Sequence, residues 1–147
     1  MSIGPSASAP RPIASIPGRL GLFWRGITRR CPWCGDRKAY FIGWYKRQDT
    51  CRACGHAYRR GDVGFEWGVV TVNIIMTFAI ILVAIAISVG LTAPDVPVMP
   101  ITFTIAAFGV LGPLLLWPVS FTLWQAVDLT MRPPTAAELA GRTADHL

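Results

Sequence analysis

The sequence predicts a small zinc ribbon followed by an all-α hairpin of two transmembrane helices. Two observations carry this prediction: four cysteines arranged as two C-x-x-C pairs, and two long charge-free runs that follow them. Hydrophobic residues make up 52% and charged residues 15% of the 147 residues, whereas a soluble domain carries about a quarter charged residues. The composition therefore argues against a soluble globular protein, and its apolar content excludes a disordered one.

Two stretches contain no Asp, Glu, Lys or Arg: residues 67–94 and residues 96–127. A helix needs about 20 apolar residues to cross the hydrocarbon core of a bilayer, so each stretch is long enough. We expect spans at about 68–91 and 101–127, joined by a turn rich in proline. The small or polar residues that we expect to pack against another helix are Asn73, Ala84, Ser88, Gly109 and Pro113.

The basic residues predict how the hairpin is oriented. Twelve of the 14 Lys and Arg residues precede residue 67, and the turn between the spans has none. Because cytoplasmic segments of membrane proteins are enriched in Lys and Arg, both termini are expected in the cytoplasm.

The remaining segments complete the predicted organisation. Residues 1–17 are expected to be a disordered leader, 18–30 an amphipathic segment at the membrane interface, 31–66 the zinc ribbon, 67–128 the hairpin and 129–147 a cytoplasmic tail. Segment 18–30 could instead pack on the cysteine module or on a partner. The residues predicted at the membrane interface are Trp24, Arg25, Arg29, Arg30, Trp67 and Trp124.

The cysteines form a C-x2-C-x16-C-x2-C motif, whose members are Cys31, Cys34, Cys51 and Cys54. Two such pairs are typical of a tetrahedral zinc site, in which each pair supplies two thiolates from one tight turn. A glycine follows each pair and permits the positive φ that such a turn often needs. Iron bound by the same four thiolates, and metal-free thiol redox chemistry, are the alternatives.

Other chemistry is not indicated. The sequence has two histidines and lacks a catalytic triad, a carboxylate pair and a phosphate-binding glycine loop, so we expect neither an enzyme nor a small-molecule substrate. His56 follows Cys54 closely, but four cysteines already complete a tetrahedron, so we expect it on the surface or behind the ligands. Nucleic acid is not expected, because the arginines offset the negative metal centre and satisfy the orientation rule.

The order of these features resembles the bacterial family labelled domain of unknown function 983. The motifs that carry the resemblance are Cys31-Pro-x-Cys34-Gly, the aromatic residues after it, Cys51-x-x-Cys54-Gly and the two spans, over about residues 20–128. Many members have Asp-Gly-Pro before the first span, where this chain has Gly61-Asp62-Val63-Gly64.

The resemblance implies a zinc-ribbon protein of the bacterial inner membrane without an assigned activity. Some relatives are encoded beside haem-copper oxidase genes, which implies an accessory or assembly subunit of a larger, respiratory membrane complex. A rubredoxin-like iron protein for electron transfer and a zinc- or redox-responsive membrane regulator are the alternative functions.

Overall fold

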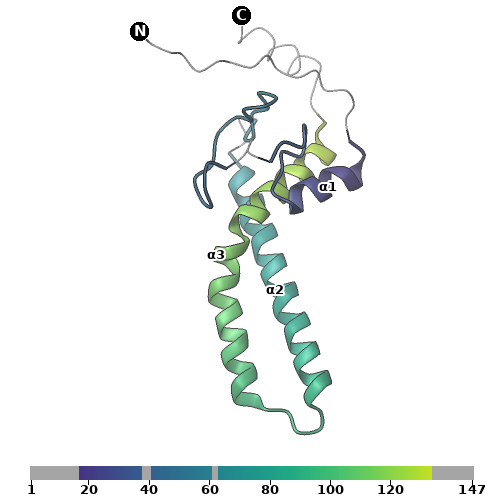
Figure 1. Ribbon diagram of the computed structural model, residues 1–147, viewed down its shortest axis with the longest axis vertical. Coiled ribbons are helices and arrows are strands. Elements are labelled where there is room, and N and C mark those ends of the chain that lie inside the picture. Colours follow the sequence, from purple (N-terminus) through teal and green to yellow (C-terminus); the bar gives the residue numbers. More distant parts are fainter. Residues whose placement is uncertain (1–16, 38–40, 61–62, 134–147) are drawn as a thin grey trace, which may run out of the picture.

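The computed structural model describes residues 17–37, 41–60 and 63–133, which form three helices and a cysteine module without a continuous strand. The predicted leader, apart from residue 17, and most of the predicted tail lie outside the described residues. Figure 1 shows a long helical hairpin, with a short helix and the cysteine loops gathered at one of its ends. The predicted fold class, a cysteine knuckle module followed by a two-helix hairpin, is confirmed.

The hairpin consists of α2 (Phe65–Thr92) and α3 (Val98–Met131). At 1.5 Å per residue, they are about 42 and 51 Å long. Both are long and apolar enough to cross a membrane, and their most apolar 18-residue windows are only 6% and 0% buried within the protein. This exposure distinguishes them from the core helices of a soluble protein, whose apolar faces are covered.

The two helices pack closely only near the cysteine module. The buried residues of α2 are Phe65, Val69, Asn73 and Thr77, which follow one another at intervals of four and therefore form a single stripe. Glycine permits the close approach, because a Cβ on Gly112 of α3 would lie 3.2 Å from Thr77 Cγ2. Beyond this stripe, large apolar side chains of both helices are exposed.

The short helix α1 (Arg19–Ile27) crosses α3 at Gly26. A Cβ at Gly26 would lie 3.0 Å from the Thr122 carbonyl oxygen and 3.2 Å from Ala126 Cβ, so only glycine fits without a shift of the helices. The Thr122 hydroxyl donates a hydrogen bond of 2.6 Å to the Gly26 carbonyl. Segment 18–30 therefore contains a helix that packs against α3, through Leu22 as well as Gly26.

The C-terminal part of α3 is enclosed by protein. Its buried residues all lie beyond residue 117 and are Pro118, Ser120, Phe121, Thr122, Gln125, Ala126, Asp128 and Leu129. They are covered by α1 and by the cysteine module. The predicted second span thus has two environments, an exposed apolar part and a part that forms the core of the module.

Candidate metal centre

The four cysteine sulfurs converge to form one site. All four lie within 4.8 Å of one another, with Cys34 Sγ 3.7 Å from Cys51 Sγ and Cys31 Sγ 4.0 Å from Cys54 Sγ. A tetrahedron with metal–sulfur bonds of about 2.3 Å has edges of about 3.8 Å, close to both distances. A disulfide needs about 2.05 Å, so the thiols are free and arranged to hold a metal ion.

Each cysteine pair lies on a tight turn, and the two turns share the same backbone geometry. In the first knuckle (residues 31–36), Gly35 N donates to the Cys31 carbonyl at 2.8 Å, and in the second (residues 51–56) Gly55 N donates to the Cys51 carbonyl at 2.8 Å. The two glycines have φ of +81° and +68°, a region that other residues rarely adopt. The sequence predicted this role for both glycines, and repetition of the turn gives the site its four ligands.

The electrostatics of the cluster favour a bound cation. Hydrogen bonds that the Cys31 thiol donates to the neighbouring sulfurs, Cys34 first, together with burial, raise its pKa far above its usual range. Hydrogen bonds from those thiols, Cys31 first, lower the pKa of Cys51. A thiolate at Cys51 is therefore stabilised by protonated neighbours, and only a metal ion allows all four groups to ionise together.

The site is closed to solvent on most sides. Cys31, Cys51 and Cys54 are buried, and Cys34 is partly exposed. Trp33 is buried beside them and stacks on the His56 ring at a centroid distance of 5.9 Å. With four protein ligands and this cover, a tetrahedral ion has no open position for water or substrate, which is the arrangement of a structural site.

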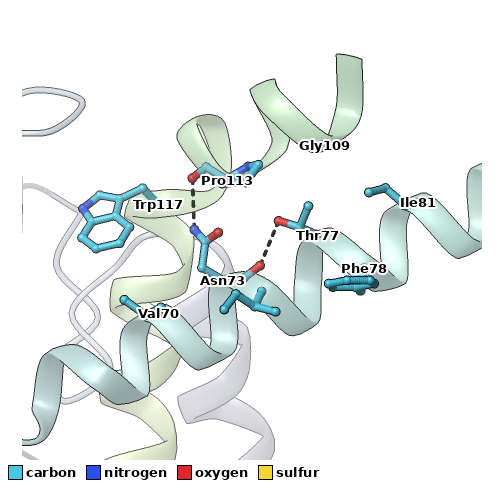
Figure 2. Close-up of a pocket in the computed structure, with 9 residues that line it drawn as sticks. Val70, Asn73, Thr77, Phe78, Ile81, Gly109, Pro113 and Trp117 are labelled. Carbon is cyan, nitrogen blue, oxygen red and sulfur yellow. Dashed lines mark hydrogen bonds between the residues drawn. The ribbon is translucent and has the colours of Figure 1, made fainter. Parts of the chain in front are cut away.

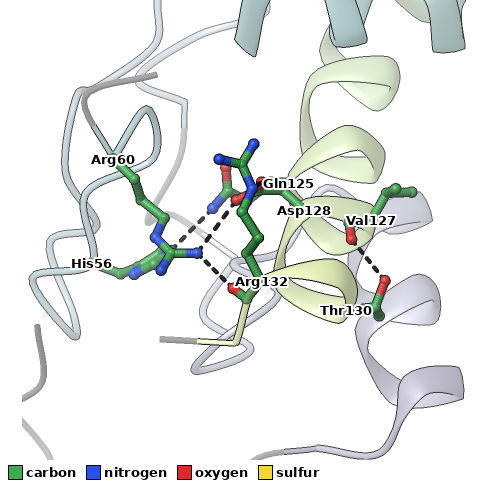
Figure 3. A network of polar contacts seen from close by, with 7 residues as sticks. All are labelled: His56, Arg60, Gln125, Val127, Asp128, Thr130 and Arg132. Carbon is green, nitrogen blue, oxygen red and sulfur yellow. Dashed lines mark hydrogen bonds and ion pairs between the residues drawn. The ribbon is translucent and has the colours of Figure 1, made fainter. Parts of the chain in front are cut away.

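His56 connects the metal site to α3. Its ring is 1% exposed, and its Nε2 lies 3.0 Å from Nε2 of Gln125, which is fully buried (Figure 3). The Cys51 amide donates to the His56 carbonyl at 2.9 Å, so this residue both completes the second knuckle and binds the helix. The sequence left two positions open for His56, on the surface or behind the ligands. Its burial excludes the surface position, and it lies behind the ligands.

An ion-pair network joins the module to the end of α3. The Asp128 carboxylate is 7% exposed and lies 3.6 Å from Arg60 Nη1 and 3.2 Å from Arg132 Nε. Arg60 Nη1 also donates to the Arg132 carbonyl at 2.6 Å, and Figure 3 shows its side chain reaching toward the end of the helix. The last turn of α3 is therefore fixed to the segment after the second knuckle by charge as well as by packing.

An aromatic cluster closes the other side of the module. The Phe121 ring of α3 makes edge contacts with Phe41 and Phe65, at centroid distances of 6.3 and 5.1 Å. The Arg47 guanidinium lies 4.8 Å from the same ring and forms an ion pair of 2.7 Å with Glu66. Arg59 also pairs with Glu66. These contacts attach the loops of the module to the start of α2.

The predicted interface residues have different surroundings. Trp24 and Trp67 are exposed, at 68% and 77%. Arg25 donates to the Pro32 and Trp33 carbonyls at 3.3 and 3.0 Å, and thereby supports the first knuckle.

The other three lie against protein to different degrees. Arg29 stacks over Trp44, and Arg30 is partly buried. The Trp124 ring lies against Gly68 of α2, so close that a Cβ at Gly68 would overlap it. Trp124 thus helps to join the two long helices.

The predicted helix-packing residues divide in a similar way. Asn73 Nδ2 donates to the Pro113 carbonyl at 3.1 Å and so links α2 to α3 (Figure 2). Ala84 and Ser88 are partly buried. Gly109 is exposed, and a Cβ placed on it would meet nothing within 4 Å, whereas the close approach of the helices occurs at Gly112.

Gly109 and Pro113 instead line a groove between the two helices. The groove has a volume of about 410 Å³ and an almost wholly apolar surface. Its other lining residues are Val70, Asn73, Ile74, Thr77, Phe78, Ile81 and Trp117 (Figure 2).

Sequence reasoning missed the residues that join the module to α3, above all Gln125, Thr122 and Asp128. Gln125 offered one signal, because a carboxamide inside a charge-free run needs a partner when it is buried. Asp128 marked the end of the charge-free run in the sequence, but nothing in the sequence indicated its ion pairs.

Comparison with known proteins gives one match. Residues 41–120 match the family model described as protein of unknown function (DUF983), which covers more than half of the chain. The chain belongs to this family. The matched range begins after the first knuckle and includes Cys51 and Cys54, so it is narrower than the resemblance inferred from the sequence. Searches of curated proteins and of solved structures found no match.

Proposed function

We propose that this DUF983 protein is a non-catalytic, integral protein of the bacterial inner membrane, whose zinc ion stabilises a cytoplasmic ribbon module. The observation that carries the proposal is the closed cluster of four cysteines at the end of an exposed apolar hairpin. The described part of the module has only two isolated antiparallel bridges, Phe41–Arg47 and Thr50–Ala57. Metal binding would therefore supply much of its folding free energy.

The charge distribution supports a cytoplasmic position for the module and both termini. The arginines of α1, those of the cysteine module and Arg132, which follows α3, all lie at the end of the hairpin that carries the metal site. The turn at the opposite end has one charged residue, Asp95. This asymmetry agrees with the positive-inside rule.

We further propose that the protein is an accessory or assembly subunit of a larger membrane complex, such as a respiratory complex. The support is the apolar groove between the two helices, where Gly109 is exposed and a Cβ placed on it would meet nothing within 4 Å. Small residues let a third helix approach closely, and van der Waals packing is the main source of helix association in membranes. The carbonyl that Pro113 leaves without an intrahelical donor is that of Gly109, which offers such a helix a polar contact.

A matched pair of substitutions tests this function. Gly109→Leu fills the groove, while Gly90→Leu places the same side chain in open space elsewhere on α2. Both variants are purified in mild detergent from native membranes after chemical crosslinking. We expect a defined membrane protein to co-purify with the wild type and with Gly90→Leu, and to be lost with Gly109→Leu. Recovery of all three as isolated chains would reject the accessory role.

A further inference from the structure

The loop at residues 41–47, which we call the aromatic loop, presents large apolar side chains to the surroundings. Ile42, Trp44 and Tyr45 are exposed by 55%, 49% and 55%. The loop is held in shape by the Phe41–Arg47 bridge and by a backbone bond of 2.9 Å from Ile42 N to the Lys46 carbonyl. Arg29 covers one side of it, 4.3 Å from the Trp44 ring. Its exposed apolar residues are therefore displayed by a folded segment.

A hydrogen bond shows how far the tip of the loop extends along α3. The Tyr45 hydroxyl donates to the Leu114 carbonyl at 3.0 Å. Leu114 lies inside the charge-free run and precedes Asp128 by 14 residues, or about 21 Å along the helix axis. The aromatic loop therefore extends along α3, far from its charged end and toward its exposed apolar part.

This hydrogen bond also has a clear chemical reason. Pro118 has no backbone N–H, so it leaves the carbonyl four residues earlier, that of Leu114, without its usual helical donor. An unsatisfied carbonyl is costly at the edge of a bilayer core, where water is scarce. Tyr45 supplies the missing donor, and its ring remains half exposed beside the helix.

Helix lengths place the same level at the boundary of the hydrocarbon core. Residues 98–114 of α3 and residues 74–92 of α2 extend from this level to the far end of the hairpin, and they correspond to about 26 and 28 Å of helix. The hydrocarbon core of a bilayer is about 30 Å thick. The remainder of each helix, toward the module, is the part that carries most of the buried residues.

We propose that the aromatic loop is a membrane anchor, which inserts Ile42, Trp44 and Tyr45 into the headgroup layer of the cytoplasmic leaflet. Amphipathic aromatic rings favour this layer, and the neighbouring cations Lys46 and Arg29 suit anionic phospholipid headgroups. The metal module would then lie on the bilayer surface, partly immersed. The inference rests on the proposed placement of α2 and α3 across the membrane.

Fluorescence quenching in phospholipid vesicles tests the anchor. The full-length protein is reconstituted in vesicles of zwitterionic and anionic phospholipid, with bromine on the acyl chains either near the glycerol or near the terminal methyl. The contribution of Trp44 is the difference between wild type and Trp44→Phe. We expect this component to be quenched roughly twofold more by bromine near the glycerol, and to be protected from aqueous iodide.

A second reporter separates failure of the anchor from failure of the membrane placement. Phe103 is 70% exposed and lies 11 residues, or about 16 Å of helix, from Leu114. This is about half the thickness of the hydrocarbon core, so Phe103→Trp reports on the bilayer centre. If that reporter is quenched by bromine near the terminal methyl while Trp44 is quenched only by iodide, the anchor is rejected and the spans stand. If neither is quenched by bromine, both proposals fail.

The Tyr45 contact is tested by a double-mutant cycle. Tyr45→Phe should increase iodide quenching of Trp44 in the wild-type background, because the loop loses the bond that fixes it to α3. In a Pro118→Ala background, the new N–H serves the Leu114 carbonyl, and Tyr45→Phe should have a smaller effect. Equal effects in both backgrounds would overturn the assignment of Tyr45 as the donor that replaces the missing N–H.

Discussion

The ion-pair network around Asp128 provides a sharp test of how the metal module is attached to the hairpin. Asp128→Asn removes the negative charge that lies between Arg60 and Arg132 but keeps the size of the side chain. The Asp128 and Arg60 side chains are 7% and 15% exposed, whereas Arg132 is 59% exposed. The substitution therefore affects one nearly buried pair and one pair that is open to water.

The magnitude follows from this difference in exposure. Removing one partner of a buried ion pair costs about 3–5 kcal/mol, because the other charge stays buried without compensation. A surface pair contributes only about 0–1 kcal/mol. Asparagine can still accept a hydrogen bond from Arg60, so we expect the module to lose about 2–3 kcal/mol of its attachment free energy. This corresponds to about a 30- to 140-fold increase in local opening.

Amide hydrogen exchange of the protein in detergent micelles measures that opening directly. Peptides from residues 51–60 and from the last turns of α3 should lose protection by this factor in Asp128→Asn. Asp95→Asn is the matched control, because Asp95 is exposed in the turn at the opposite end of the hairpin. If both variants exchange like the wild type, the network does not hold the module and the reasoning from burial is refuted.

Two further substitutions probe other contacts. Gly68→Val places a branched side chain in the position of the Trp124 ring, so the two long helices must separate near the module. We expect this variant to have reduced thermal stability. Gly90→Val places the same side chain in open space and should change the thermal stability little. Arg25→Ala removes two hydrogen bonds to first-knuckle carbonyls. It should cost about 1–3 kcal/mol and accelerate metal release to a chelator, and an unchanged release rate would contradict the supporting role of Arg25.

The metal site was predictable because its information is local. Ligand type, ligand spacing and the glycine after each pair together determine the two turns, and the structure places Cys31 and Cys51 in matching positions on them. The two long helices were predictable for a similar reason, since uninterrupted apolar runs decide both their length and their exposure.

The attachment of the module to the hairpin could not be predicted, because it depends on residues far apart in sequence. The Gly26 and Thr122 contact joins positions 96 residues apart, and the Gln125 and His56 contact joins positions 69 apart. The apolar face of segment 18–30 indicated that this face is covered by protein or lipid. In the structure α3 covers it, because Gly26 has no side chain to keep the two helices apart. Amphipathic periodicity describes a face but does not identify what packs on it.

The same limit applies to the helix-packing glycines. The sequence gives no reason to distinguish Gly109 from Gly112, because both lie in the same apolar run, within four residues of Pro113. Only the relative rotation of the two helices places Gly112 against Thr77 and leaves Gly109 open in the groove.

The metal content of the purified protein tests the central claim most directly. We expect one zinc ion per chain by elemental analysis of detergent-solubilised protein, and a large loss of zinc in Cys34→Ser while the helix content from α2 and α3 is retained. A red protein with one iron per chain would replace structural zinc by a rubredoxin-like centre. A folded, metal-free wild-type protein, or full zinc content in Cys34→Ser, would contradict the four-thiolate site.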